Sequence, residues 1–114
     1  IQYIRNTLAR NELMIGIFYL KQNSPSSSIK RFKSILLNFQ NTDVIPETLY
    51  RLCEAFLMIG LKQEAIKSNA LLNYNFPKNE WTELSKNLFQ KDYNLNNNKG
   101  LAYSIKNYIK TIFD

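Results

Sequence analysis

The stretch Ile15-Gly16-Ile17-Phe18-Tyr19-Leu20 has a counterpart 37 residues later, Leu52-Cys53-Glu54-Ala55-Phe56-Leu57. In both copies a small residue is followed three positions later by an aromatic residue. The same offset relates two further pairs, Ser28 with Ala65 and Phe39 with Phe76. A fixed period of this size is typical of arrays of helix pairs, and most such arrays are binding scaffolds. The period therefore favours a repeat protein over an enzyme.

Apolar residues recur at helical spacing through the chain, which predicts an all-α protein of about six antiparallel helices. Ser24 and Pro25 suit the start of the second helix, as a capping residue and a proline at the first helical position. Asn41 to Asp43 reads as a turn with a capping residue, and Gly60 as the stop of the third helix. Lys78 or Asn79 opens the fifth helix, and the sixth covers 101–112.

The spacing of small and aromatic residues matches the tetratricopeptide repeat, W-x₂-L-G-x₂-Y followed by Ala, Phe and Pro. Small residues let two helices approach, so we expect crossings at Gly16/Ser28 and at Cys53/Ala65. The predicted architecture is a tetratricopeptide-type helix-pair solenoid in one domain, 1–114, with units of about 8–42, 43–78 and 79–114. Because Ile1 already lies in a helical pattern, we expect the chain to be the C-terminal part of a longer one.

The composition argues against several functional classes. The chain of 114 residues has no His and one Cys, so the usual nucleophile–base and metal-binding constellations are lacking. We therefore expect no cofactor, no metal and no small-molecule substrate, and a packing role for Cys53 at the small position. No apolar run is long enough to span a membrane. The net charge of +6 permits nucleic acid or an acidic protein as a partner, but it does not select between them.

Two groups of residues are candidates for protein binding. Lys30-Arg31-Phe32-Lys33 is basic, although Phe32 is a core position of the repeat and the charges also suit an ordinary solvated face. In such arrays the first helix of each pair lines the inner groove, to which the second unit offers Tyr50, Glu54, Leu57 and Met58. The first unit offers Leu13, Ile17 and Leu20, and we expect these three to form an apolar patch covered by a preceding repeat. Two interpretations of these apolar residues remain: they line a groove that binds an apolar segment, or other helices cover them.

Several phrases of this sequence resemble one family. They are Leu8-Ala9-Arg10-Asn11-Glu12-Leu13, Glu47-Thr48-Leu49-Tyr50-Arg51-Leu52 and Leu72-Asn73-Tyr74-Asn75-Phe76-Pro77. Together with Ile29-Lys30-Arg31-Phe32 and Trp81 they resemble the C-terminal half of the BamD family, over about 1–88. These proteins are tetratricopeptide lipoproteins of the bacterial outer-membrane β-barrel assembly machine.

The resemblance implies a non-enzymatic scaffold on the periplasmic face of the outer membrane. It implies binding to the periplasmic POTRA region of BamA and to other subunits of the assembly machine. Arg31 stands where the family has an arginine tied to BamA contact, with Lys30 and Lys33 as its neighbours. Attachment to the membrane would use only a lipid anchor that is missing from this chain. Two alternatives remain: a cytoplasmic tetratricopeptide adaptor that holds a peptide in its groove, and, less favoured, a basic nucleic-acid-binding repeat.

Overall fold

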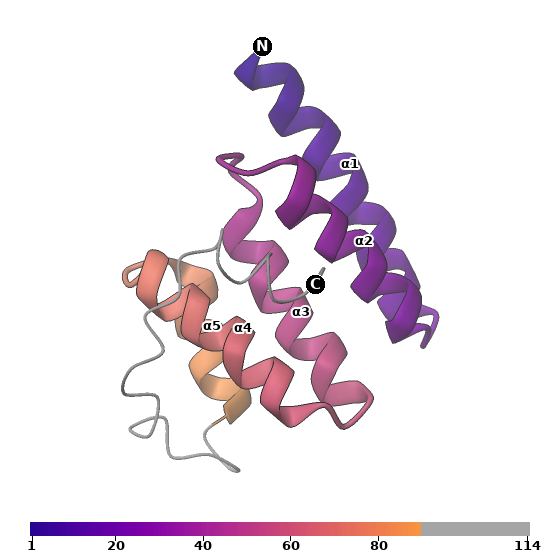
Figure 1. The fold of residues 1–114 in the computed structure, drawn as a ribbon, viewed down its shortest axis with the longest axis vertical. Helices are drawn as coiled ribbons and strands as arrows, with labels where there is room; N and C mark the ends of the chain where they lie inside the picture. The colour runs from indigo at the N-terminus through magenta and orange to yellow at the C-terminus, as the bar shows by residue number, and fades with distance from the viewer. Residues whose placement is uncertain (90–114) are drawn as a thin grey trace.

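The structure, a computed structural model, describes residues 1–89 and consists there of five helices without a strand. Neighbouring helices along the chain pack antiparallel in two successive pairs, followed by a shorter fifth helix (Figure 1). This arrangement confirms the all-α, tetratricopeptide-type solenoid. The expected sixth helix, at 101–112, lies outside the described residues. The helices are α1 (Gln2–Lys21), α2 (Pro25–Asn38), α3 (Ile45–Met58), α4 (Lys62–Asn75) and α5 (Glu80–Phe89).

The period seen in the sequence is also the period of the backbone. A shift of 37 residues carries the bounds of α2 onto those of α4, and the last residue of α1 onto that of α3. The turns inside the two pairs match as well, because Asn23 and Gly60 both adopt a left-handed conformation, with φ of 59° and 77°. In each turn the next backbone N–H reaches back five residues, from Ser24 to Tyr19 O at 2.8 Å and from Leu61 to Phe56 O at 2.9 Å.

Two predicted helix caps are wrong and one is confirmed. Ser24 occupies the N-cap of α2, but its side chain makes no capping hydrogen bond, because its ψ of 66° falls short of the usual extended geometry. The N-cap of α3 is Val44 and not a residue of 41–43, because the Thr42 hydroxyl turns back to donate to Phe39 O at 2.7 Å. Asn79 does open α5, since its Oδ1 accepts the backbone N–H of Trp81 at 2.9 Å.

The two helix pairs cross where the sequence predicted. At the first crossing Gly16 lies against the ring of Phe32 so closely that a methyl group on Gly16 would collide with it. The Ser28 hydroxyl donates to Gly16 O at 2.8 Å in the same buried contact. At the second crossing the Cys53 thiol lies 3.5 Å from Ala65 O, and burial raises the pKa of this thiol. Cys53 is fully buried, which agrees with its predicted role in packing.

The core runs through both pairs, with α2 packed against α3 and with α5 against α3 and α4. The expectation that Leu13, Ile17 and Leu20 form an open patch is wrong. Leu13 is 0% exposed, Ile17 is 8% exposed, and Leu20 packs against the core. Leu13, Ile17 and Leu20 follow one another at spacings of four and three, so they share one side of α1, and α1 packs mainly on α2.

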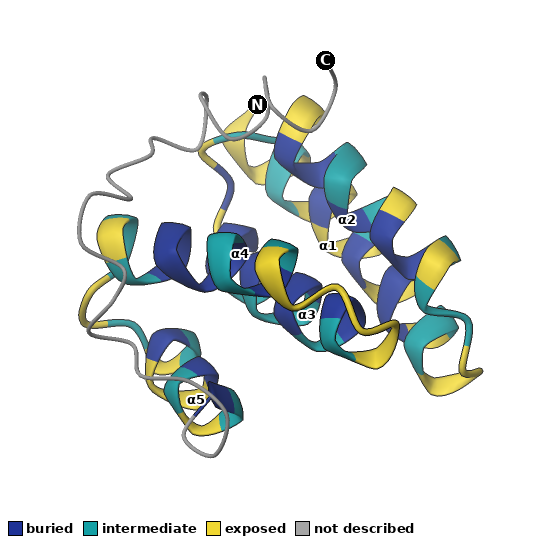
Figure 2. Cartoon of the chain, turned by 60° about the horizontal axis from the view of Figure 1, so that its bottom comes forward, coloured by how far each residue is buried: buried dark blue, intermediate teal, exposed yellow. Residues whose placement is uncertain are grey.

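The exposed apolar residues of α1 lie on another side of the helix. Ile4, Leu8, Ile15 and Phe18 are between 38% and 59% exposed, and Figure 2 shows the exposed turns along this helix. One period later, at Ile45, Leu52 and Ala55 of α3, the residues that correspond to Leu8, Ile15 and Phe18 are buried. The exposed apolar face of α1 therefore corresponds to a face of α3 that neighbouring helices cover.

The Gly16–Phe32 contact gives a first prediction. Gly16→Ala should destabilise the protein by about 1–3 kcal/mol, because the added methyl group overpacks a crossing without free space. Phe32→Leu, combined with Gly16→Ala, should cost less than the sum of the two single changes, since the smaller side chain gives way. Urea unfolding of the four proteins measures this coupling. If the losses of unfolding free energy in the two single variants add up to that of the double variant, the contact is contradicted.

The comparison of equivalent positions gives a second prediction. Leu52→Ala should cost about 2–5 kcal/mol of unfolding free energy, because Leu52 is fully buried. Ile15→Ala, one period earlier on the same face, should change stability by less than about 1 kcal/mol, because Ile15 is 38% exposed. Equal losses in thermal unfolding would mean that the outer face of α1 is covered in solution.

Candidate protein-binding surface

Arg31 projects from α2 toward α1. Its Nη1 lies 3.2 and 3.3 Å from the two carboxylate oxygens of Glu12, and the Arg31 side chain is 41% exposed. An ion pair this open contributes at most about 1 kcal/mol to stability. It does hold the guanidinium in place, and the remaining N–H groups stay available for an acidic partner.

The neighbouring cations of α2 do not form one patch with Arg31. Lys30 is exposed, whereas the Nζ of Lys33 lies 5.8 Å from the ring centroid of Phe56 on α3. Arg31 and Lys33 thus reach toward opposite neighbouring helices, α1 and α3. The basic stretch divides over the surface of α2, with Lys30 as the side chain that faces solvent most freely.

The three candidate residues of α3 differ in how open they are. Tyr50 and Leu57 are half-buried against the core, whereas Met58 is 47% exposed. The Tyr50 ring lies 5.3 Å from that of Trp81 on α5, measured between centroids. Burial raises the pKa of Tyr50, and Glu54 adds to this shift while Arg51 opposes it. Helix α5 therefore covers the Tyr50 end of this face, and the Met58 end stays open.

Arg51 is the central residue of this face, and the sequence reasoning gave it no role. Its Nη2 lies 3.2 Å from Glu47 and its Nη1 2.9 Å from Glu54, while its guanidinium carbon lies 5.4 Å from the Trp81 ring centroid. Burial acts to lower the pKa of Arg51, but the hydrogen bonds and charges of the two carboxylates raise it overall. The spacing of Glu47, Arg51 and Glu54 on one helix signals these ion pairs; the contact with Trp81 needs the fold.

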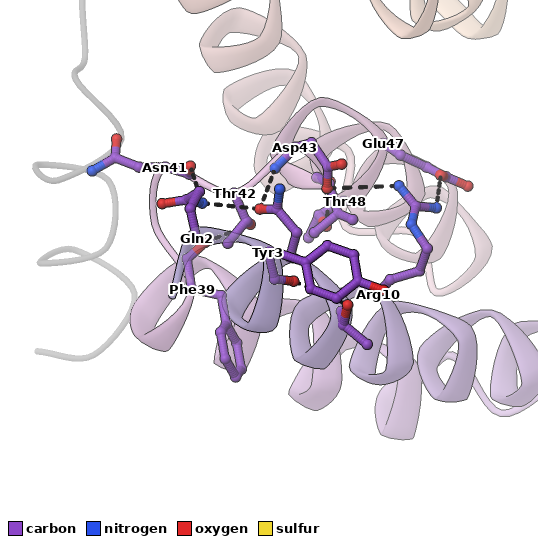
Figure 3. A network of polar contacts seen from close by, with 12 residues as sticks. Gln2, Tyr3, Arg10, Phe39, Asn41, Thr42, Asp43, Glu47 and Thr48 are labelled. Atoms are coloured by element: carbon purple, nitrogen blue, oxygen red, sulfur yellow. Dashed lines mark hydrogen bonds and ion pairs between the residues drawn. The ribbon is translucent and has the colours of Figure 1, made fainter.

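A polar network holds the α2–α3 loop against the start of α1 (Figure 3). Gln2 Nε2 donates to Asn41 O at 3.2 Å, and Asn6 Oδ1 accepts the backbone N–H of Asp43 at 3.3 Å. Arg10 lies 3.8 Å from the carboxylate of Asp43 and 3.9 Å from that of Glu47. The first six residues of α1 have no helical counterpart before α3, so this extension supplies the loop with partners that the second unit lacks.

An open pocket of about 240 Å³ lies beside this network. Arg10 and Asp43 both line it and lie 3.8 Å apart, so the pocket has no excess of positive charge with which to select an anion. Its hydroxyl and amide groups can pair with hydrogen-bond donors and with hydrogen-bond acceptors. The lining residues are Tyr3, Asn6, Thr7, Arg10, Asn11 and Asp43.

Residues 1–89 offer neither a cluster of metal ligands nor a helix suited to crossing a membrane. No group of three His, Cys, Asp or Glu side chains in this part is placed to hold a metal ion. Among the described helices, none combines the length and the hydropathy that crossing a membrane requires.

Comparisons with known proteins agree with the resemblance seen in the sequence. The profile of the YfiO family, described as outer membrane lipoprotein, matches residues 1–71. The chain is 43% identical over 81 residues to the outer membrane protein assembly factor BamD of Rickettsia prowazekii, which covers 71% of this chain. It is 38% identical over 106 residues to BamD of Caulobacter vibrioides, covering 93% of this chain. No solved structure gave a significant match.

The matches cover only part of these relatives. The chain spans 32% of the length of each of the two BamD proteins. A third relative, BamD of Neisseria meningitidis, is 30% identical over 73 residues, which cover 64% of this chain and 27% of that protein. From the extent of the profile match and the identity to these relatives, it follows that the chain belongs to the YfiO family of outer membrane lipoproteins, together with BamD.

Proposed function

We propose that the chain is a non-enzymatic protein-binding scaffold in the assembly of outer-membrane β-barrel proteins. It acts on the periplasmic face of the outer membrane and docks on the periplasmic POTRA region of BamA. The observation that carries this proposal is membership of a family whose curated members are named outer membrane protein assembly factors. The helix-pair architecture supports it, because such arrays bind through their surfaces.

The docking surface in this proposal is centred on Arg31. The ion pair with Glu12 restricts the arginine side chain before a partner binds. Binding then costs less side-chain conformational entropy. A guanidinium fork matches a carboxylate with two parallel hydrogen bonds. Lys30, exposed one residue earlier, adds positive charge beside it, whereas Lys33 is turned toward α3 and lies outside this surface. The surface thus suits an acidic patch on a folded domain.

A second candidate function is a peptide-binding adaptor that uses the face of α3. The exposure of Met58 and the half-buried Leu57 beside it favour this alternative, because apolar side chains at an open groove can receive an apolar segment. Tyr50 would border that groove, where Trp81 already covers part of its ring. We also propose that the helix pairs divide the chain into units of about 8–42, 43–78 and 79–114 within one domain.

Nucleic acid is disfavoured by the distribution of charge in residues 1–89. Phosphate binding needs cations that are free to replace counterions. Here five of the basic residues already form ion pairs with carboxylates, which compete with phosphate for them. These five are Arg10, Arg31, Arg51, Lys67 and Lys86.

The proposal predicts a charge-specific loss of binding. Arg31→Glu should weaken the affinity for the isolated periplasmic region of BamA at least about tenfold, which corresponds to about 1.4 kcal/mol. Arg31→Lys should recover only part of this loss, because an ammonium group cannot form the bidentate contact. Surface plasmon resonance measures the affinities, and circular dichroism checks that helicity is unchanged.

Glu12→Gln is the matched control for this experiment. It removes the intramolecular partner of Arg31 and leaves the arginine itself, so binding should stay within about threefold of the parent. Equal affinity of Arg31→Glu and the parent protein would remove Arg31 from the interface and refute this docking surface.

A further inference from the structure

The turn between α3 and α4 carries three large apolar side chains in four residues. Met58 is 47%, Ile59 40% and Leu61 46% exposed. Single exposed apolar residues are ordinary on protein surfaces, but a contiguous group marks an interaction site. We refer to Met58, Ile59 and Leu61 as the apolar turn.

The fold does not require apolar residues at these positions. The turn between α1 and α2 has the same hydrogen bonds, with Asn23 N–H donating to Leu20 O at 3.0 Å and Gly60 N–H to Leu57 O at 3.1 Å. Yet the residues that correspond there to the apolar turn are Lys21, Gln22 and Ser24. The backbone thus forms equally well with polar side chains, and the apolar ones need another explanation.

The shape of the apolar turn suits insertion better than a protein interface. A Cβ atom added at Gly60 would meet nothing within 4 Å, so the turn projects into open space. Three side chains on one turn fall well short of the roughly 800 Å² that each partner buries in a standard protein interface. A few apolar side chains can, however, hold a protein at a lipid surface when positive charge assists them.

The charges around the apolar turn are positive. Lys62 follows it directly, and Lys21 lies on the α1–α2 turn at the same edge of the array (Figures 1 and 2). Neither 58–63 nor 20–27 contains Asp or Glu. Apolar side chains flanked by lysines match the interface of a membrane with anionic phospholipids.

We propose that the apolar turn contacts the surface of a phospholipid bilayer, with Ile59 and Leu61 among the upper acyl chains and Lys62 near anionic headgroups. This inference rests on the proposed location at the outer membrane. It adds a membrane contact made by the folded array itself. Met58 also belongs to the α3 face discussed above, so the test uses Ile59 and Leu61 only.

The test transplants the polar turn onto the apolar one. Ile59→Gln with Leu61→Ser gives the apolar turn the residues of the α1–α2 turn at two of its positions, where Ser24 already occupies the matching N-cap position. The full chain is mixed with vesicles of phosphatidylethanolamine and phosphatidylglycerol, and the bound fraction is measured by flotation. The double variant should bind at least five times less than the parent. Leu84→Gln, at a residue of α5 that is 42% exposed, should bind within twofold of it.

The outcomes separate this inference from the proposed function. Lys62→Gln should reduce binding to these vesicles and have no effect with phosphatidylcholine alone. Arg31→Glu, which tests docking on BamA, should float like the parent. If the double variant floats like the parent, or if the parent does not float at all, the inference is wrong. It is also wrong if the double variant loses BamA binding while its flotation is unchanged, since the turn is then a protein contact.

Thermal unfolding by circular dichroism accompanies each variant. Should the double variant fail to fold, Leu61→Ser alone takes its place, and a loss of at least twofold in flotation is then expected. A folded Leu61→Ser protein that floats like the parent would overturn the inference.

Discussion

The close approach of α1 and α2 at Gly16 determines how this protein is built. With no side chain on Gly16, the Phe32 ring fills the space beside the backbone of α1. Once Phe32 is fixed in the core, its neighbours on α2 are fixed too. Arg31 then reaches Glu12 on α1, and Lys33 reaches Phe56 on α3. The candidate docking surface is therefore a consequence of one helix crossing.

The same crossing recurs one period later with different chemistry. In the first pair a hydroxyl on the second helix, that of Ser28, donates to a carbonyl of the first. In the second pair the polar atom is on the first helix, where the Cys53 thiol faces Ala65 O. Since burial raises the pKa of the thiol, it stays protonated at neutral pH and serves as a small packing group. The repeat thus preserves the crossing of the two helices and not the residues that form it.

The period and the spacing of small and aromatic residues were enough to predict the helix pairs and both crossings. They did not predict which sides of α1 are covered, because α1 has two apolar sides. Leu13 belongs to the buried side, whereas Ile15 belongs to the exposed one. A pattern of apolar residues shows that a helix buries a side, but the partner of each side follows only from the packing of neighbouring helices.

Polar contacts between distant residues were the hardest to foresee. Asn69 stands where the repeat usually has Phe, and its Oδ1 accepts a hydrogen bond from the Ser85 hydroxyl at 2.6 Å, which joins α4 to α5. Arg51 joins α3 to α5 through Trp81 in a similar way. Both contacts link residues from different helices, so no spacing within one helix reveals them. They decide how far α5 covers the face that carries Tyr50.

The architecture depends on the contact between Gly16 and the ring of Phe32. Nuclear magnetic resonance of the folded chain tests this contact directly. We predict strong nuclear Overhauser effects between the Gly16 Hα protons and the Phe32 ring protons, and Hα shifts displaced by the ring current. Absence of these effects in a protein that is otherwise helical would contradict the crossing, and with it the placement of Arg31.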